Sequence, residues 1–336
     1  MPKPVGLANL GNTCYLNSTL QLLAQIPELR NLKHNVANTV PSTCLIDEWL
    51  ELLHIIDSTG TSGTFVSPTR FVQAVRGVAA HEGKMQFTGF AQNDATEFLY
   101  FLLNGWHDAA KRPVKMHISG TGDTEKDKLA KLCYDTLKQT YEKEYSEMMQ
   151  LFFGITTNKI IPMNSGENTA QYSAELFSIL HVPISNARPT EEGWSVMSCI
   201  REYAKGTQVD YNGGQAIKET SFWTLPKYMF IALGRFSGDG RRKNDREVSV
   251  PARLDLSEFI SSYNPLKYSN YELMGVVLHM GSLHGGHYVS VVRTLDNQWY
   301  SCNDTCVFLE EEFVEKKLSH PNMTRGAYIL LYKNMA

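Results

Sequence analysis

The segment Gly6–Leu23 contains the best-placed candidate nucleophile of the chain, Cys14. Leucines at helical spacing follow Cys14, and Asn12 and Thr13 offer cap chemistry before it, so Cys14 is expected in the first turn of a helix. Free backbone N–H groups and the positive end of the helix dipole favour a thiolate there. Asn9 offers an amide for a developing oxyanion. Alternatively, Cys14 is a small apolar residue buried in the helix.

A second segment, Gly281–Arg293, supplies a candidate general base, His287. Residues 276–280 and 288–293 have the composition of two strands, and a glycine-rich turn joins them. His287 is therefore expected where the second strand begins, with one side rigid and the other open, which suits a general base. Gly285 and Gly286 leave room for something to pass close to the backbone.

A polar pair, Asn303 and Asp304, follows on the next expected strand. Either residue could hydrogen-bond the far ring nitrogen of His287 and fix its tautomer, as the third member of a cysteine triad does. A zinc site is the competing interpretation, because a His-x-x-His and a Cys-x-x-x-Cys supply the ligand types that zinc prefers. Its ligands would be His284, His287, Cys302 and Cys306. Alternation along a strand explains the two cysteines equally well.

A third polar group opens the expected helix Gln92–Leu103. Asp94 is placed as an N-cap, and Glu97 follows three residues later, as in a capping box. By composition alone, capping and solvation account for Gln92, Asp94 and Glu97.

The first third of the chain is expected to be helical and the remainder mainly stranded. Residues 108–127 have loop composition, and residues 237–245 are expected to form a polar hairpin tip whose three consecutive basic residues are solvated. Further helices are expected at 46–56, 68–75, 129–149 and 196–205. Strands are expected at 151–161, 174–183, 221–236, 272–280, 288–293 and 327–333. Segregated helices and strands are typical of an α+β fold.

The composition is that of a globular chain, with 336 residues, 43% of them hydrophobic and 20% charged. The net charge of -3 gives no reason to expect nucleic acid or an anionic membrane as the main partner. The chain contains no apolar run of transmembrane length, and its N-terminus does not resemble a signal peptide. The six cysteines are too sparse for a disulfide scaffold, which favours a reducing intracellular compartment, the cytoplasm or the nucleus.

Taken together, these segments resemble the ubiquitin-specific proteases, papain-like cysteine proteases that remove ubiquitin. Residues 6–18 are similar to the cysteine box of that family, residues 92–98 to its glutamine–aspartate box and residues 285–304 to its histidine box. Residues 225–236 and 327–332 match two further core strands. The motifs occur in the family's order over nearly the whole chain.

The resemblance implies an α+β, papain-like fold shaped as a right hand, in one catalytic domain over residues 1–336. The thumb would span about 1–150, and the palm and fingers about 151–336. The implied roles are nucleophile for Cys14, general base for His287, orienting residue for Asn303, oxyanion donor for Asn9 and a share of the orienting role for Asp304.

The resemblance also implies a channel for the extended C-terminal tail of ubiquitin, which is cationic and ends in two glycines. Gln92 and Asp94 would hold this tail, since a carboxylate facing an arginine is the expected pairing. Gly285, Gly286 and Tyr288 would line the narrow end of the channel.

The sequence departs from the family at the fingers. Many members carry two Cys-x-x-Cys pairs that bind zinc, but residues 158–165 and 209–214 contain no cysteine. We therefore predict fingers held by strand pairing and packing, without zinc or any other cofactor. Gly234 stands where a lysine is common, and nothing in the sequence explains this change.

The sequence thus predicts a deubiquitinase, which hydrolyses the peptide or isopeptide bond after the C-terminal glycine of ubiquitin. Two alternatives remain: the same chemistry on a ubiquitin-like modifier, and a non-catalytic ubiquitin-binding scaffold. The expected partners are ubiquitin and ubiquitinated proteins, with no nucleic acid and no membrane, and the chain is expected to be monomeric.

Overall fold

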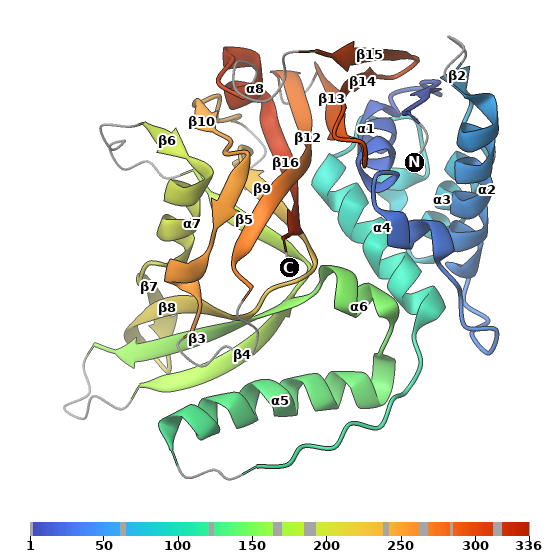
Figure 1. Cartoon of the computed structure of the whole chain (residues 1–336). Coiled ribbons are helices and arrows are strands. Elements are labelled where there is room, and N and C mark those ends of the chain that lie inside the picture. The colour runs from blue at the N-terminus through green and yellow to red at the C-terminus, as the bar shows by residue number, and fades with distance from the viewer. Residues whose placement is uncertain are drawn as a thin grey trace.

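A computed structural model describes residues 3–60, 65–120, 124–163, 170–184, 193–237, 242–261, 268–282, 285–311 and 318–335. The helices are α1 (Cys14–Leu23), α2 (Thr43–Thr59), α3 (Thr69–His81), α4 (Ala95–Ala110), α5 (Glu125–Glu144), α6 (Glu147–Phe152), α7 (Val196–Ala204) and α8 (Pro321–Gly326), with short 3-10 turns at Pro27–Asn31, Met85–Phe87 and Ser257–Phe259. The strands are β1 (Gly6–Leu7), β2 (Phe65–Val66), β3 (Gly154–Pro162), β4 (Gln171–Phe177), β5 (Ile179–Pro183), β6 (Trp194–Ser195), β7 (Thr207–Tyr211), β8 (Gly214–Thr224), β9 (Tyr228–Gly234), β10 (Val248–Ser249), β11 (Arg253–Asp255), β12 (Asn270–Ser282), β13 (Gly285–Arg293), β14 (Trp299–Asn303), β15 (Cys306–Glu310) and β16 (Ala327–Asn334). Figure 1 shows helices α1–α4 beside a central sheet, with a second sheet and α5 at the other end.

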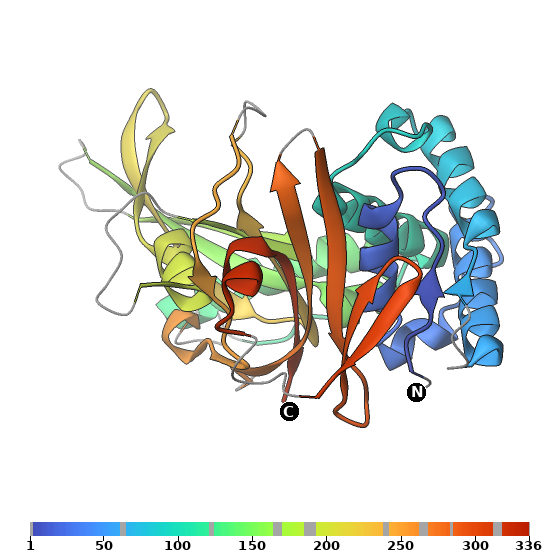
Figure 2. The same ribbon diagram turned by 90° about the horizontal axis from the view of Figure 1, so that it is seen from above.

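Helix α1 lies at the centre of the helical part, where it contacts strand β13 of the sheet on one side and helix α4 on the other (Figure 2). The expected helix starting at Cys14 is confirmed, but all ten of its residues are buried, including the polar ones. The polar side chains find partners inside the protein: the Gln21 amide donates to the Val5 carbonyl, and the Ser18 hydroxyl to the Tyr15 carbonyl. The helix that carries Cys14 is therefore held on all sides.

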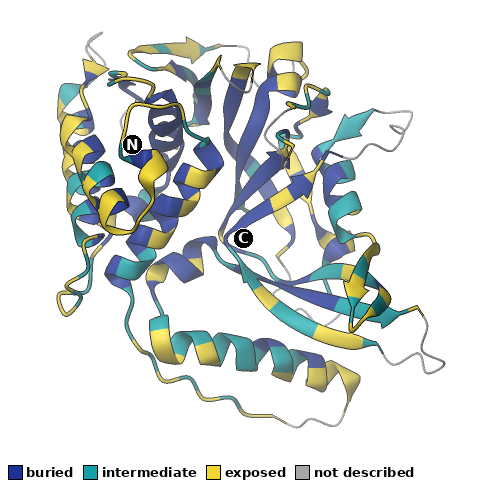
Figure 3. Cartoon of the chain, turned by 180° about the vertical axis from the view of Figure 1, so that it is seen from behind, coloured by how far each residue is buried: buried dark blue, intermediate teal, exposed yellow. Residues whose placement is uncertain are grey.

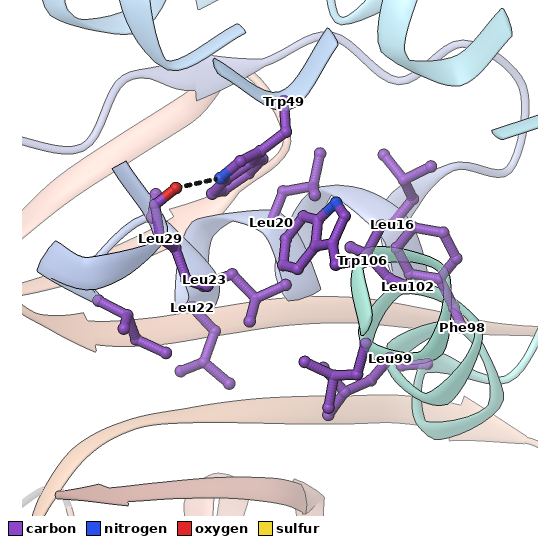
Figure 4. Packing of buried hydrophobic residues seen from close by; sticks show 14 of the residues in the cluster. Leu16, Leu20, Leu22, Leu23, Leu29, Trp49, Phe98, Leu99, Leu102 and Trp106 are labelled. Carbon is purple, nitrogen blue, oxygen red and sulfur yellow. Dashed lines mark hydrogen bonds between the residues drawn. The ribbon is translucent and has the colours of Figure 1, made fainter. Parts of the chain in front are cut away.

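Two tryptophans from neighbouring helices pack against the leucines of α1 (Figure 4). The rings of Trp49 in α2 and Trp106 in α4 lie 5.2 Å apart between their centroids. The Trp49 indole N–H also donates to the carbonyl of Leu29, at 2.9 Å. Large aromatic side chains in a close-packed core leave α1 little freedom to shift.

The central sheet has eight strands, with β15-β14-β13-β12-β16-β9-β5 as its path and β11 paired to β12. Only β5 and β9 pair in parallel along that path. The predicted hairpin around His287 is confirmed as β12–β13, and the predicted strand at 327–333 is confirmed as β16. The hairpin strands are longer than predicted, because their ends contain glycines that carry no strand signal.

The second sheet has four strands in the order β4-β3-β8-β7, and α5 packs across it. Cys133 of α5, Ile155 of β3 and Trp223 of β8 form a small core of their own between helix and sheet. Most of α5 remains exposed or half-buried (Figure 3). We call this sheet, with α5, the finger region.

The prediction of one long helix at 129–149 is wrong, because this segment forms two helices, α5 and α6. Tyr145 is extended and forms a bridge with Arg112, and Ser146 then precedes α6. Helix α5 also starts earlier than predicted, inside the expected loop 108–127, because Thr124 and Asp127 form a capping box.

Two predicted strands are each divided between the two sheets. The segment 174–183 breaks at Ser178 into β4 and β5, and the segment 221–236 breaks into β8 and β9. Pro226 lies in the second break, where its missing N–H would leave a gap in a ladder. Periodicity cannot distinguish one long strand from two that enter different sheets.

The expected hairpin tip at 237–245 lies partly outside the described residues. Of its three basic residues, Lys243 contradicts the expected solvation, since its side chain is only 8% exposed. Among the helices of the described ranges, none combines the length and apolar character needed to cross a membrane.

Candidate active site

Cys14 is the first residue of α1, and it is only 3% exposed. The expected capping by the residues before it does not occur. The Thr13 hydroxyl accepts from the N–H of Leu10 instead of from the first turn, and Asn12 adopts a left-handed backbone with φ of 55°. The first-turn N–H groups therefore remain available near the sulfur.

The environment of the Cys14 thiol contains opposing influences on its pKa. Burial raises the pKa above its ordinary value, and the backbone N–H groups of Tyr288 and Tyr15 lower it. The Asp304 carboxylate raises the pKa again, and the balance is a raised pKa. Helix α1, which begins with Cys14, packs against β13, which carries His287.

His287 lies near the start of β13, and its ring is oriented by Asn303 at the end of β14. The His287 Nε2 and Asn303 Oδ1 atoms are 2.7 Å apart. Because Oδ1 can only accept, Nε2 carries the proton, and Nδ1 of the neutral ring is free to act as a base. The structure thus brings His287 and Asn303 together as the sequence predicted.

Asp304 bonds to the cysteine segment, and no described hydrogen bond joins it to His287. Its two carboxylate oxygens accept from the side-chain amides of Asn9, at 2.9 Å, and Asn17, at 2.8 Å. Asp304 has a left-handed backbone, with φ of 47°, and its own carbonyl accepts from Leu7. Asp304 therefore holds the end of β14 against α1, and the expectation that it shares the orientation of His287 is not supported by these contacts.

The Asn9 side chain is also engaged on both of its polar atoms. Its Oδ1 accepts from the backbone N–H groups of Gly11 and Thr13, at 3.2 and 3.1 Å. Its Nδ2 donates to Asp304, which leaves one further amide hydrogen for an oxyanion. The Asn9 side chain thus shapes the turn that precedes Cys14, and it still has one amide hydrogen for the expected role as oxyanion donor.

Gln92 contacts the histidine hairpin from the helical side. Its Nε2 donates to the Gly286 carbonyl at 2.8 Å, and its Oε1 accepts from the Gly286 N–H at 3.3 Å. This reciprocal pair links the segment before α4 to the residue just before His287, so Gln92 binds the protein itself in this structure.

The predicted N-cap of α4 is confirmed, because Asp94 Oδ1 accepts from the N–H groups of Thr96 and Glu97. Its Oδ2 accepts from the Tyr328 hydroxyl at 2.5 Å. Asp94 and Glu97 line one pocket of about 360 Å³ together with Tyr100, His181, Phe236 and Tyr328. Burial, and then Asp94, raise the pKa of Glu97, and the Lys84 ammonium offsets only part of that effect.

Gly286 and Tyr288 have roles in packing. A Cβ atom on Gly286 would overlap Nε2 of the buried His279, whereas one on Gly285 would meet only Ser282 Oγ at 3.8 Å. The Tyr288 ring is buried against His279, with centroids 4.7 Å apart. The Tyr288 ring is therefore part of the core, and the expectation that it lines a substrate channel is not supported by these contacts.

The zinc alternative is not supported by the described residues. His284 lies outside them, His287 Nε2 is bonded to Asn303, and burial raises the pKa of Cys302 to about 12. Within the described ranges, no group of three or more His, Cys, Asp or Glu side chains could hold a metal ion.

Sequence reasoning missed three residues of the site: Asn17, His279 and Tyr328. Asn17 interrupts the apolar face of α1, which is the one signal that could have drawn attention to it. His279 and Tyr328 lie in strands whose pattern suggests only core packing. Burial lowers the pKa of His279 to about 4, with Lys243 adding to the effect, so its imidazole is neutral.

A cysteine at a helix N-terminus, a histidine on a facing strand and an asparagine bonded to that histidine form the arrangement of papain-like cysteine proteases. The family model described as "Ubiquitin carboxyl-terminal hydrolase" matches residues 5–332. The chain belongs to this family, and its fold is the papain-like fold of the ubiquitin-specific proteases.

Similar proteins support the assignment over nearly the full chain. Ubiquitin carboxyl-terminal hydrolase 2 of Homo sapiens is 29% identical over 98% of this chain and 54% of its own length. Ubiquitin carboxyl-terminal hydrolase 25 of Arabidopsis thaliana is 26% identical over 98% of this chain and 47% of its own length. The chain thus spans about half the length of these relatives.

Among solved structures, the SAGA Ubp8/Sgf11/Sus1/Sgf73 DUB module bound to ubiquitin aldehyde has a similar fold. The TM-score is 0.69 at 21% identity, over 99% of this chain and 70% of that one. The same module bound to monoubiquitin also gives a TM-score of 0.69, at 20% identity, over 99% of this chain and 69% of that one.

Proposed function

We propose that the protein is a cysteine-type deubiquitinase that hydrolyses the peptide or isopeptide bond after the C-terminal glycine of ubiquitin. The observation that carries this proposal is the packing of α1, which begins with Cys14, against β13, which carries His287, whose ring is bonded to Asn303 at 2.7 Å. Family membership supports ubiquitin as the modifier.

In the proposed reaction, Cys14 is the nucleophile. His287 Nδ1 takes the thiol proton as the sulfur attacks the glycine carbonyl, and Asn303 holds the resulting imidazolium. The protonated His287 then donates to the leaving amine, which leaves a thioester on Cys14. Water attacks the thioester with His287 again as base, and the carboxylate and the free thiol are released. The raised pKa of Cys14 fits a neutral thiol that is deprotonated during attack.

The oxyanion is proposed to lie at the start of α1. No side chain caps the first turn of α1, so its backbone N–H groups are the candidate donors, and Asn9 keeps one amide hydrogen for the oxyanion. Asp304 fixes the Asn9 amide from the opposite side, so its proposed part in catalysis is to orient the oxyanion donor.

The cationic tail of ubiquitin is proposed to run past the pocket that contains Asp94 and Glu97. The Glu97 carboxylate is exposed there, as expected for an arginine site. Gln92 and Gly286 are bonded to each other across the expected path, so the tail would have to replace that contact or pass beside it. A Cβ atom on Gly285 would make only an ordinary contact, with Ser282 Oγ at 3.8 Å, in keeping with a channel wall.

The same chemistry on a ubiquitin-like modifier is the second candidate, since the finger region lacks the cysteine pairs common in the family. The test is turnover of ubiquitin carrying a fluorogenic amide at its C-terminus, in parallel with two ubiquitin-like modifiers carrying the same leaving group. Hydrolysis of the ubiquitin substrate by the wild type but not by Cys14→Ala supports the proposal. Turnover of another modifier alone supports the second candidate, and tight ubiquitin binding without turnover supports the scaffold.

We further propose that the protein acts as a monomer on ubiquitin and ubiquitinated proteins in a reducing compartment, the cytoplasm or the nucleus. All six cysteines are free thiols, and Cys306 is exposed, which supports such a compartment.

A further inference from the structure

Lys243 is a nearly buried cation in the segment between β9 and β10. Its ammonium group donates to the carbonyls of His279, at 3.2 Å, and Gly281, at 3.0 Å, and it pairs with Asp245 at 2.9 Å. A buried lysine is tolerated only when it is paired and hydrogen-bonded, and these three contacts meet that requirement. The position is therefore specific for a cationic donor.

The two carbonyls lie where β12 loses one of its neighbours. Strand β12 pairs with β16 only as far as Leu278, which lies opposite Ala327. Carbonyls of alternate residues in a strand point to the same edge, so those of His279 and Gly281 would continue the lost ladder. Lys243 supplies the donor that β16 no longer provides.

The clamped residues flank the cross-strand partner of His287. Met280 lies opposite His287 in the β12–β13 register, and Gly281 lies opposite Gly286. A shift of β12 at His279 or Gly281 would therefore be passed to its partner β13, the strand that carries His287.

The segment that carries Lys243 is itself anchored. The buried guanidinium of Arg235 donates to the carbonyls of Asn244 and Arg246, and also to those of Thr324 in α8 and Ala327 at the start of β16. Asp245 lies between Asn244 and Arg246, whose carbonyls Arg235 holds. The backbone that carries the ion-pair partner of Lys243 is therefore fixed in place. Gln92 holds Gly286 from the opposite side.

We infer that Lys243 is a positioning residue of the active site: it clamps the end of β12 so that His287 keeps its place relative to Cys14. The inference rests on the proposed function for its catalytic consequence, but the clamp itself does not depend on that function. It assigns a role in the reaction to a side chain that makes no contact with Cys14 or His287 among the described interactions.

The test compares Lys243→Met, which keeps the length and removes the donor, with Lys243→Arg, which keeps the charge. Lys131→Met is the matched control, because Lys131 pairs with Asp135 at the same distance of 2.9 Å on α5, with its side chain 67% exposed. On a fluorogenic ubiquitin amide, Lys243→Met should lower kcat about tenfold with KM changed less than about twofold, since misplaced catalytic groups cost rate. Lys243→Arg should recover most of kcat, and the control should match the wild type.

Amide hydrogen exchange on the same variants separates this inference from the proposed function. In Lys243→Met, the amides of residues 279–282 and 285–288 should exchange about tenfold faster, while those of α1 stay unchanged. An unchanged kcat in an active enzyme overturns the positioning role, whatever the exchange shows. If the wild type does not hydrolyse ubiquitin, the proposed function fails, and exchange alone then decides: faster exchange supports the clamp, and unchanged exchange overturns it.

Discussion

The bond between His287 and Asn303 decides which nitrogen of the imidazole is basic. With Nε2–H donating to Asn303 Oδ1, the Nδ1 lone pair is the one available for the Cys14 proton. A neutral amide is enough to fix the tautomer, because the His287 Nε2–H needs only an acceptor. An aspartate would in addition stabilise the imidazolium by its charge.

Replacing Asn303 tests that assignment. Asn303→Ala should lower kcat about 100-fold or more with little change in KM, because the ring loses its fixed tautomer and orientation. Asn303→Asp keeps the acceptor and should retain most of the activity. Steady-state kinetics on a ubiquitin amide substrate measure both. Full activity in Asn303→Ala would show that another group orients His287.

The Asp304 carboxylate affects the pH at which the Cys14 thiol ionises. Burial and Asp304 both raise the pKa of the thiol, so its thiolate fraction reaches one half at a higher pH than in an ordinary cysteine. Asp304→Asn removes a negative charge and should move the midpoint of Cys14 alkylation to lower pH. The signal of Cys14→Ala is subtracted, because Cys306 is exposed and also reacts. A midpoint that stays in place would contradict the electrostatic role.

At the level of elements, the β12–β13 hairpin is the part of the fold that the chemistry depends on most. Its final turn combines a left-handed Gly281, with φ of 95°, and a Gly286 pressed against His279. The hairpin is also held by Gln92 from the helical side. Small changes in this hairpin therefore act directly on His287.

Two adjacent glycines of the hairpin should respond very differently to alanine. Gly286→Ala forces the new methyl group against His279 and should lower the free energy of unfolding by about 1–3 kcal/mol. Gly285→Ala makes only an ordinary contact, with Ser282 Oγ at 3.8 Å, and should leave the free energy of unfolding within about 0.5 kcal/mol. Chemical denaturation of both variants gives the comparison. Equal stability of the two would mean that His279 gives way without cost.

Sequence reasoning succeeded where the signal is local. The helix at Cys14, the cap at Asp94 and the hairpin at His287 depend on neighbouring residues, and all three are present in the structure. It failed where the partner is distant: the contact of Tyr328 with Asp94 and that of Lys243 with β12 depend on tertiary placement. The division of residues 174–183 between two sheets is another such case, because both halves have the same strand pattern.

For the whole molecule, the finger region is joined to the central sheet by strands that run on from one sheet into the other. Strand β8 leads into β9 and β4 into β5, and α5 covers the finger sheet with Cys133 against Trp223. Ladder hydrogen bonds, this small core and side-chain hydrogen bonds such as that of Thr220 to Asn158 hold the fingers together.

A metal chelator tests this description of the fingers. Prolonged treatment with EDTA and 1,10-phenanthroline should leave the thermal midpoint and the turnover of a ubiquitin substrate unchanged, because sheet and helix packing need no ion. A midpoint that falls with chelator and returns with zinc would contradict the prediction and assign the finger region a structural metal.

The most direct test of the central claim is covalent labelling by ubiquitin that carries an electrophile in place of its C-terminal carboxylate. The account predicts a single adduct on the wild type, located on the peptide that contains Cys14 by mass spectrometry, and no adduct on folded Cys14→Ala. An adduct that persists in Cys14→Ala, or none on the folded wild type, would contradict it.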